Sequence, residues 1–158
     1  LDVENVWKSS DDSLKVVGFA MMMDDLLSRA EPGIVIPDIE VRGELSTWKK
    51  TRTVSRRLSS LKGERNIIIF YTEGCEVCAA EKKAASAILS SADDRSLTSK
   101  ERRIARRTRV MTVNMDRMMN EDPQLASRLM DAFDLSSLPF IVITDRKGVI
   151  QHRYASLS

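Results

Sequence analysis

The chain has 158 residues, a formal net charge of +2, 42% hydrophobic and 30% charged residues, as expected for one globular domain, alone or with an extension. Its two cysteines and one histidine are too few for a disulfide-rich scaffold or a four-ligand structural zinc site. No apolar run is long enough to cross a bilayer. We therefore expect no bound metal and no stable membrane insertion of this chain.

The first 32 residues predict a helical extension. Ser10 and the two aspartates after it offer N-cap oxygens, and apolar side chains over residues 16–30 recur at helical spacing. Pro32 with its glycine neighbour ends the element. We therefore predict two units, an N-terminal helical extension over residues 1–32 and a domain over residues 33–158.

The segment that follows predicts little regular structure. Residues 34–41 predict an edge strand interrupted by Pro37, and residues 42–44 predict a turn. Residues 49–60 are polar and basic, and we predict irregular structure there with at most a short strand.

Basic residues concentrate in two stretches, residues 49–65 and 95–109. Such clusters can bind nucleic acid. Aromatic residues for stacking are few, however, and no helix-turn-helix or zinc-finger spacing is present. We therefore interpret both stretches as charged surface and expect no nucleic-acid partner.

The remainder of the chain predicts alternating strands and helices. Residues 66–71 have the length and composition of a strand buried on both faces, and a helix follows from about Cys75 to about Ser90. Thr98 and Glu101 form a capping-box pattern for a short surface helix. A strand is predicted over residues 110–114, and a helix starts at Asp122-Pro123. The predicted inner face of this helix consists of Leu125, Leu129, Met130 and Phe133. Two strands, over residues 140–144 and 149–154, are joined by a hairpin loop at residues 145–148. This order predicts an α/β fold with a central mixed β-sheet flanked by helices.

Both cysteines lie in one motif, Cys75-Glu76-Val77-Cys78, directly after the predicted buried strand. This layout places a dithiol in the first turn of a helix. Unpaired backbone N–H groups and the helix dipole stabilise a thiolate there, and the second cysteine is close enough to close a disulfide. The motif therefore predicts thiol–disulfide exchange, with a static disulfide or two inert thiols as the structural alternative.

The segment from Phe70 to Glu81, FYTEGCEVCAAE, resembles the active-site segment of thioredoxin-fold proteins. It is most similar to the TlpA/ResA branch, extracytoplasmic thiol–disulfide oxidoreductases related to the AhpC/TSA group. The resemblance extends over roughly residues 33–155, through Pro37-Asp38, Leu58 to Gly63, Ser137 to Phe140 and Asp145 to Gly148. It implies a thioredoxin-like fold, disulfide exchange with protein thiols and disulfides, an upstream thiol electron donor, no cofactor, and a location outside the cytoplasm, either periplasmic or tethered to a membrane.

The resemblance also implies roles for individual residues. Cys75 would be the exposed nucleophile, and Cys78 the buried resolving thiol. Pro139 would form a cis peptide bond and face the dithiol, which leaves the backbone of Leu138 free to pair with an extended substrate strand. The alternative for Pro139 is an ordinary trans proline that opens a strand.

Two glutamates bear on the reaction. Glu81 lies three residues after Cys78 and shares a helix face with it, so a carboxylate there could take the proton of Cys78, as in the TlpA/ResA-like pattern CxxCxxE. A solvated helix glutamate is the alternative. Thioredoxin itself carries an acid on its central strand, where this chain has Ile69. Glu76 puts a negative charge beside Cys75, which disfavours the thiolate and predicts a reducing or mid-potential exchanger.

The chain departs from the family pattern beside both cysteines. Many relatives carry tryptophan before the first cysteine and proline before the second, where this chain has Gly74 and Val77. Loss of the aromatic contact surface keeps a non-catalytic binding module as an alternative. A peroxide-reducing enzyme is disfavoured, because the cysteines share one CxxC turn and no threonine–proline setting precedes Cys75. We interpret the sole histidine, His152, as an ordinary surface or edge residue of a late strand.

Overall fold

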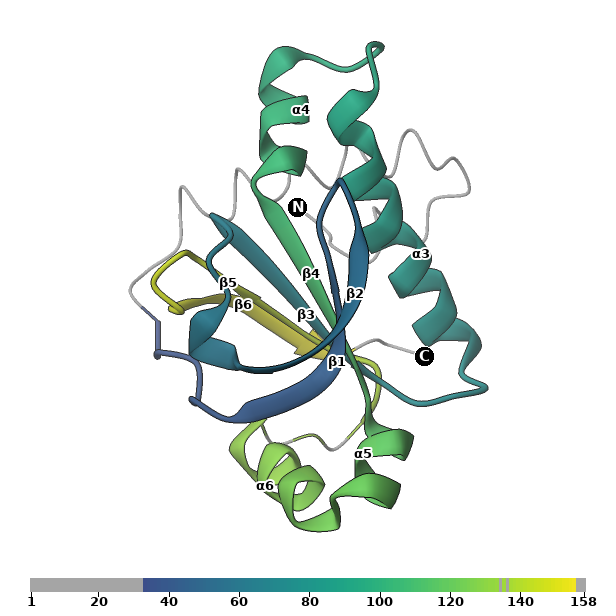
Figure 1. Ribbon diagram of the computed structural model, residues 1–158, viewed down its shortest axis with the longest axis vertical. Coiled ribbons are helices and arrows are strands. Elements are labelled where there is room, and N and C mark those ends of the chain that lie inside the picture. The colour runs from purple at the N-terminus through teal and green to yellow at the C-terminus, as the bar shows by residue number, and fades with distance from the viewer. Residues whose placement is uncertain (1–32, 134, 136, 156–158) are drawn as a thin grey trace.

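The computed structural model describes residues 33–133, 135 and 137–155. The predicted helical extension and the boundary after residue 32 lie outside the described residues. Within the described part, six strands form one mixed sheet in the order β2-β1-β4-β3-β5-β6 (Figure 1). The strands are β1 (Glu40–Ser46), β2 (Thr51–Arg57), β3 (Arg65–Tyr71), β4 (Thr108–Asn114), β5 (Phe140–Thr144) and β6 (Ile150–Ala155). The α-helices are α3 (Glu76–Ser90), α4 (Ser99–Arg106), α5 (Met115–Glu121) and α6 (Pro123–Phe133), with 3-10 turns at Leu58–Ser60 and Ser91–Asp93.

The central strand β3 delivers the chain to the cysteine motif. It pairs in parallel with β4 and antiparallel with β5. Ile67 and Ile69 pack with the apolar side chains of α3, whereas Ile68 and Phe70 belong to the core cluster that includes α6. The rings of Phe70 and Phe133 have their centroids 5.0 Å apart. Because both faces are covered, β3 is apolar at successive positions, and the predicted buried strand is confirmed.

The β3–α3–β4 unit followed by the β5–β6 hairpin makes the fold thioredoxin-like, so the predicted α/β class with its mixed sheet and flanking helices is confirmed. Figure 1 shows α3 along one side of the sheet, α4 beyond the end where β4 begins, and α5 with α6 at the end where β4 terminates. Since β3 and β4 are parallel, the loop from β3 to α3 leaves the sheet at this same end. No helix in the described part of the chain is long and apolar enough to span a membrane.

The helix starts follow the predicted capping chemistry. The backbone N–H of Thr98 donates to Glu101, and the backbone N–H of Glu101 donates to the hydroxyl of Thr98, so the capping box of α4 is confirmed. The backbone N–H of Leu125 donates to Asp122 Oδ1 at 3.1 Å, which caps the start of α6. Met130 is 40% exposed, so its predicted inner position is wrong. The buried stripe of α6 runs through Ala126, Leu129 and Phe133, and Met130 lies beside it.

The hairpin of β1 and β2 differs from the structure predicted for residues 34–60. The predicted turn at residues 42–44 is wrong, because β1 runs through it and pairs along its length with β2. A Cβ at position 43 would overlap the carbonyl oxygen of Thr112, so Gly43 marks a close approach of two backbones. Of the predicted strand over residues 34–41, Val35 makes only an isolated bridge with Val149, and β1 begins at Glu40.

Asp38 ties the segment before β1 to the end of the hairpin. Its carboxylate accepts hydrogen bonds from the hydroxyl of Ser59 at 2.6 Å and from Nε of Arg57 at 3.0 Å. These bonds favour the ionised carboxylate, and they lower the pKa of Asp38 below its usual value. Because the ion pair between Asp38 and Arg57 is exposed to solvent, it contributes little to stability. Its main effect is to hold the chain in position where it enters β1.

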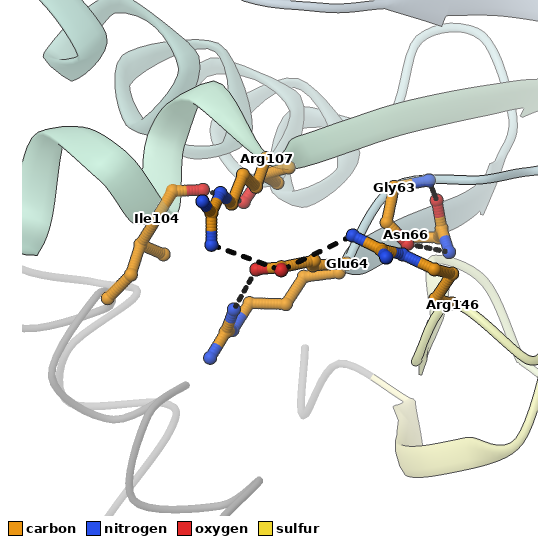
Figure 2. Close-up of polar contacts among 8 residues, drawn as sticks. Gly63, Glu64, Asn66, Ile104, Arg107 and Arg146 are labelled. Atoms are coloured by element: carbon orange, nitrogen blue, oxygen red, sulfur yellow. Dashed lines mark hydrogen bonds and ion pairs between the residues drawn. The ribbon is translucent and has the colours of Figure 1, made fainter.

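The end of the sheet opposite the cysteines is held by polar side chains. Figure 2 shows Glu64 between the guanidinium groups of Arg107 and Arg146, with nitrogen–oxygen distances of 3.1 and 3.3 Å. Beside it, the buried Asn66 accepts a bond from the backbone N–H of Gly63 at 3.0 Å and donates to the Gly63 carbonyl at 3.1 Å. Nδ2 of Asn66 also donates to the carbonyl of Asp145 at 3.1 Å, which joins β3 to the β5–β6 hairpin.

Replacement of Asn66 by alanine should therefore destabilise the fold. The change leaves the backbone groups of Gly63, which are buried, and the partly buried carbonyl of Asp145 without their partner, so we expect a loss of about 2–4 kcal/mol in the free energy of unfolding, measured by urea denaturation. Thr144→Val is the matched control, because it removes only the 3.3 Å contact from Asn66 and keeps the shape. A loss no larger for Asn66→Ala than for this control would contradict the assignment.

Candidate active site

The cysteine motif begins α3. Cys75 is the N-cap residue, with extended backbone angles (φ −93°, ψ 111°), and its Sγ accepts a hydrogen bond from the backbone N–H of Cys78 at 3.1 Å. The two residues form a disulfide, and their Cα atoms lie 5.2 Å apart. After reduction, the same N–H and the start of the helix would face a negative charge on the Cys75 sulfur, which they stabilise.

The two sulfurs differ in their access to solvent. Cys75 is half-buried, whereas Cys78 is only 1% exposed. The turn before them is open, because a Cβ on Gly74 would meet no described atom within 4 Å. Gly74 has a φ of 72°, in the left-handed region that favours glycine, so a tryptophan here would be strained by the backbone. The sulfur of the first cysteine can therefore be reached from solvent, whereas that of the second is shielded.

The loop between β3 and α3 is anchored to α5. The backbone N–H of Glu73 donates to Asp116 Oδ2 at 2.9 Å, and Nδ2 of Asn114 donates to Glu73 Oε1 at 2.8 Å. Asn114 also caps α5 by accepting from the backbone N–H of Arg117 at 3.0 Å. These residues were not predicted from the sequence. The available signal was an asparagine that ends a predicted strand, followed two residues later by an acid, which is a helix-start pattern.

A hollow of about 310 Å³ adjoins the dithiol. Cys75 and Cys78 line it together with Tyr71 at the end of β3 and Lys82 on α3. The Nζ atom of Lys82 lies 3.9 Å from the centroid of the Tyr71 ring, within cation–π distance. Neither Tyr71 nor Lys82 was singled out from the sequence, because nothing in their spacing shows that a strand end and a helix turn meet here.

Glu81 lies one turn beyond Cys78 on the buried face of α3. It is 2% exposed, and the neighbouring buried positions of the helix are Cys78, Ala84 and Ala85. The alternative of a solvated surface glutamate is therefore wrong. A carboxyl at this position is shielded from bulk water and lies on the side of the helix to which Cys78 points.

Leu138 and Pro139 lead into β5 at the same end of the sheet. The peptide bond between them is cis, as predicted. Phe140 pairs with Phe70 in the antiparallel β3–β5 ladder, so Pro139 lies near the point where β3 gives way to the cysteine loop. Pro139 is buried and Leu138 is half-buried. The backbone just before β5 is thus placed beside the end of β3.

His152 lies on β6, opposite Ile143 of β5. Burial lowers the pKa of its imidazole below the usual value. Within the described residues, no group of three or more histidine, cysteine, aspartate or glutamate side chains is arranged to hold a metal ion.

No family model and no curated protein matches the chain. Solved structures that resemble it include an exposed lipoprotein thioredoxin of Streptococcus pneumoniae, with 18% identity, a TM-score of 0.43 and coverage of 77% of this chain and 91% of that one. Another is the thioredoxin domain of a thiol-disulfide oxidoreductase from Bacteroides vulgatus, with 16% identity, a TM-score of 0.42 and coverage of 78% and 87%. A putative electron transfer protein of Aquifex aeolicus has 13% identity, a TM-score of 0.42 and coverage of 80% and 86%.

Proposed function

We propose that this protein is a thiol–disulfide oxidoreductase of the TlpA/ResA-like kind, which exchanges disulfides with protein substrates through Cys75 and Cys78. One observation carries the proposal: a half-buried cysteine at a helix N-cap is joined to a fully buried cysteine one turn later. This asymmetry is what disulfide exchange requires, because one sulfur must reach the substrate and the other must wait within reach. The reaction needs no metal or organic cofactor.

The reaction begins from the reduced protein. The Cys75 thiolate attacks one sulfur of a substrate disulfide, the substrate S–S bond breaks, and the departing substrate sulfur takes up a proton. This step leaves a mixed disulfide between Cys75 and the substrate. Stabilisation of the attacking thiolate comes from the helix start, including the N–H of Cys78 that contacts the Cys75 sulfur.

Resolution follows when Cys78 loses its proton. In our proposal the Glu81 carboxylate accepts that proton, and the Cys78 thiolate then attacks the Cys75 sulfur. The mixed disulfide breaks, the second substrate sulfur leaves as a thiol, and Cys75 and Cys78 are joined. Two electrons have passed from the protein to the substrate, and an upstream dithiol donor must return them for another cycle.

Leu138 and Pro139 are the proposed substrate contacts. Their place before β5 and beside the exit of β3 would let an extended substrate segment lie against this loop while its sulfur is bonded to Cys75. The buried proline offers no N–H, so pairing would fall to the backbone of Leu138.

The direction of exchange is proposed to be reducing or mid-potential. Glu76 is exposed in the first turn of α3, next to Cys75, and its negative charge disfavours the thiolate. A location outside the cytoplasm, periplasmic or membrane-tethered, belongs to the same proposal through the resemblance of the CxxCxxE segment. A measured Cys75 pKa far below neutral, together with a strongly oxidising potential, would refute the proposed direction.

The test of the function is turnover of a model protein disulfide by the reduced full chain with a small dithiol as donor. Catalysed reduction supports the proposal, and absence of turnover would indicate the non-catalytic binding module. Peroxide consumption in a parallel assay, without protein disulfide turnover, would indicate the peroxide-reducing enzyme instead. The turn at Gly74 is open and offers no aromatic contact surface. This observation favours the non-catalytic binding module as the second candidate function.

A further inference from the structure

We propose that Lys82, held by the ring of Tyr71, is a positioning residue that stabilises the thiolate of Cys75. The inference deepens the proposed function, on which it rests, because it assigns a source of charge stabilisation to the attacking sulfur. Lys82 lines the hollow beside the dithiol together with both cysteines.

Carboxyl groups surround Cys75, so a cation in this hollow would change the stability of its thiolate. Glu73 lines the hollow from the preceding loop, and Glu76 follows Cys75 in the first turn. Asp116 binds the loop from α5, and Glu81 lies buried below on α3. All four carboxyl groups, when ionised, oppose a negative charge on the Cys75 sulfur. Tyr71 and Cys78 are the other titratable groups that line the hollow.

Lys82 is the only cationic side chain among the described residues that line this hollow. No carboxylate in the described part of the chain lies within 4.0 Å of its Nζ, so no close ion pair there neutralises its positive charge. It is also half-buried, which weakens the screening of its charge by water and salt. A cation in this position favours the thiolate form of a nearby thiol.

The ring of Tyr71 explains how Lys82 is held at this hollow. A free lysine side chain samples many rotamers, and its ammonium group would on average lie in solvent. The contact of 3.9 Å between Nζ and the ring centroid fixes the ammonium against the end of β3. Tyr71 is itself held by pairing with Asn114 of β4 and packs against the core cluster beneath α3. Tyr71 thus affects the thiolate of Cys75 indirectly, by holding Lys82 in place.

The test measures the rate of alkylation at Cys75 in the reduced full chain as a function of pH, with the modified cysteine identified by peptide mass. Lys82→Met keeps an unbranched stem over the ring and removes the charge. We expect its profile to move upward by about half to one pH unit, so alkylation below both midpoints should slow by about three- to tenfold. Lys82→Arg keeps the charge and should restore the profile of the unaltered protein.

Lys83→Met is the matched control, because it removes the same charge one residue further on from an exposed side chain that does not line the hollow. An unshifted Lys82→Met profile would overturn the inference, as would an equal shift in Lys83→Met. Tyr71→Leu should shift the profile in the same direction in the unaltered chain and leave it unchanged in Lys82→Met. A shift of equal size in both backgrounds would show that the ring acts on Cys75 without the lysine.

The alkylation profile requires only a reduced Cys75 and no substrate turnover. The inference can therefore fail while protein disulfides are still turned over, and the proposed function can fail while the profile responds to Lys82. The two results are read from different assays on the same proteins.

Discussion

Replacement of Cys78 by serine is expected to convert the protein from a catalyst into a covalent trap. Cys75 keeps its half-buried position at the N-cap of α3, so it can still attack a substrate disulfide. The mixed disulfide then has no internal sulfur to resolve it, and turnover should fall by about a thousandfold or more. The adduct should appear on non-reducing gels as a band that disappears with added dithiol, and its mass identifies the bound substrate.

Cys75→Ser is the control that shows which of the two cysteines attacks the substrate disulfide. Cys78 is only 1% exposed, so its lone thiol should form no adduct with a protein disulfide at a comparable rate. If Cys75→Ser trapped substrates as well as Cys78→Ser did, the two sulfurs would not have the distinct roles that their burial gives them. Trapping by neither variant, with no turnover by the unaltered chain, would leave the disulfide a structural link.

The active-site half of the fold was predictable because its signals are local. Residues 67–70 form an uninterrupted apolar run shortly before the CxxC turn, and a run of this length is typical of a strand covered on both faces. Helical periodicity then places Cys78, Glu81, Ala85 and Ile88 on one stripe of α3, and all four are buried. The helical spacing therefore predicts that Glu81 is buried, whereas the charge of its carboxylate favours a position in solvent, and the sequence alone does not decide between the two.

The first hairpin was not predictable in the same way. The strand β2 consists almost entirely of polar and basic residues, and its exposed and half-buried side chains give no apolar signal. It is a strand because its backbone pairs with β1, which in turn pairs with β4. Gly43 indicates a turn in the sequence, but in the sheet it permits a close approach to Thr112. Pairing between distant segments overrode local propensity.

The polar contacts around the dithiol were also hidden from the sequence. Glu73 and Asn114 are 41 residues apart, and their bond depends on β3 and β4 being parallel neighbours. The contact between Tyr71 and Lys82 depends on how α3 crosses the end of β3. The motif thus identifies the reacting sulfurs, whereas the residues that tune and anchor them follow only from the tertiary structure.

Glu81→Gln should separate the two chemical steps. Glutamine has nearly the same shape as glutamate and fits the same buried position, but it cannot accept the proton of Cys78 as a carboxylate would. We expect attack by Cys75 to keep its rate and resolution of the mixed disulfide to slow by about 10–100-fold, since a positioned base contributes at least that much. Rapid mixing of the reduced protein with a disulfide substrate, quenched by acid at successive times, should show the mixed disulfide accumulating and then decaying slowly.

The matched control is Glu76→Gln, which removes the same charge from an exposed position in the first turn of the same helix. This variant should resolve the mixed disulfide at the original rate and should attack no more slowly, because a carboxylate beside Cys75 opposes its thiolate. Equal resolution rates in Glu81→Gln and the unaltered chain would remove Glu81 from the mechanism. Slow resolution in both variants would instead point to the overall charge of the helix start, and Cys78 would then have to lose its proton directly to water.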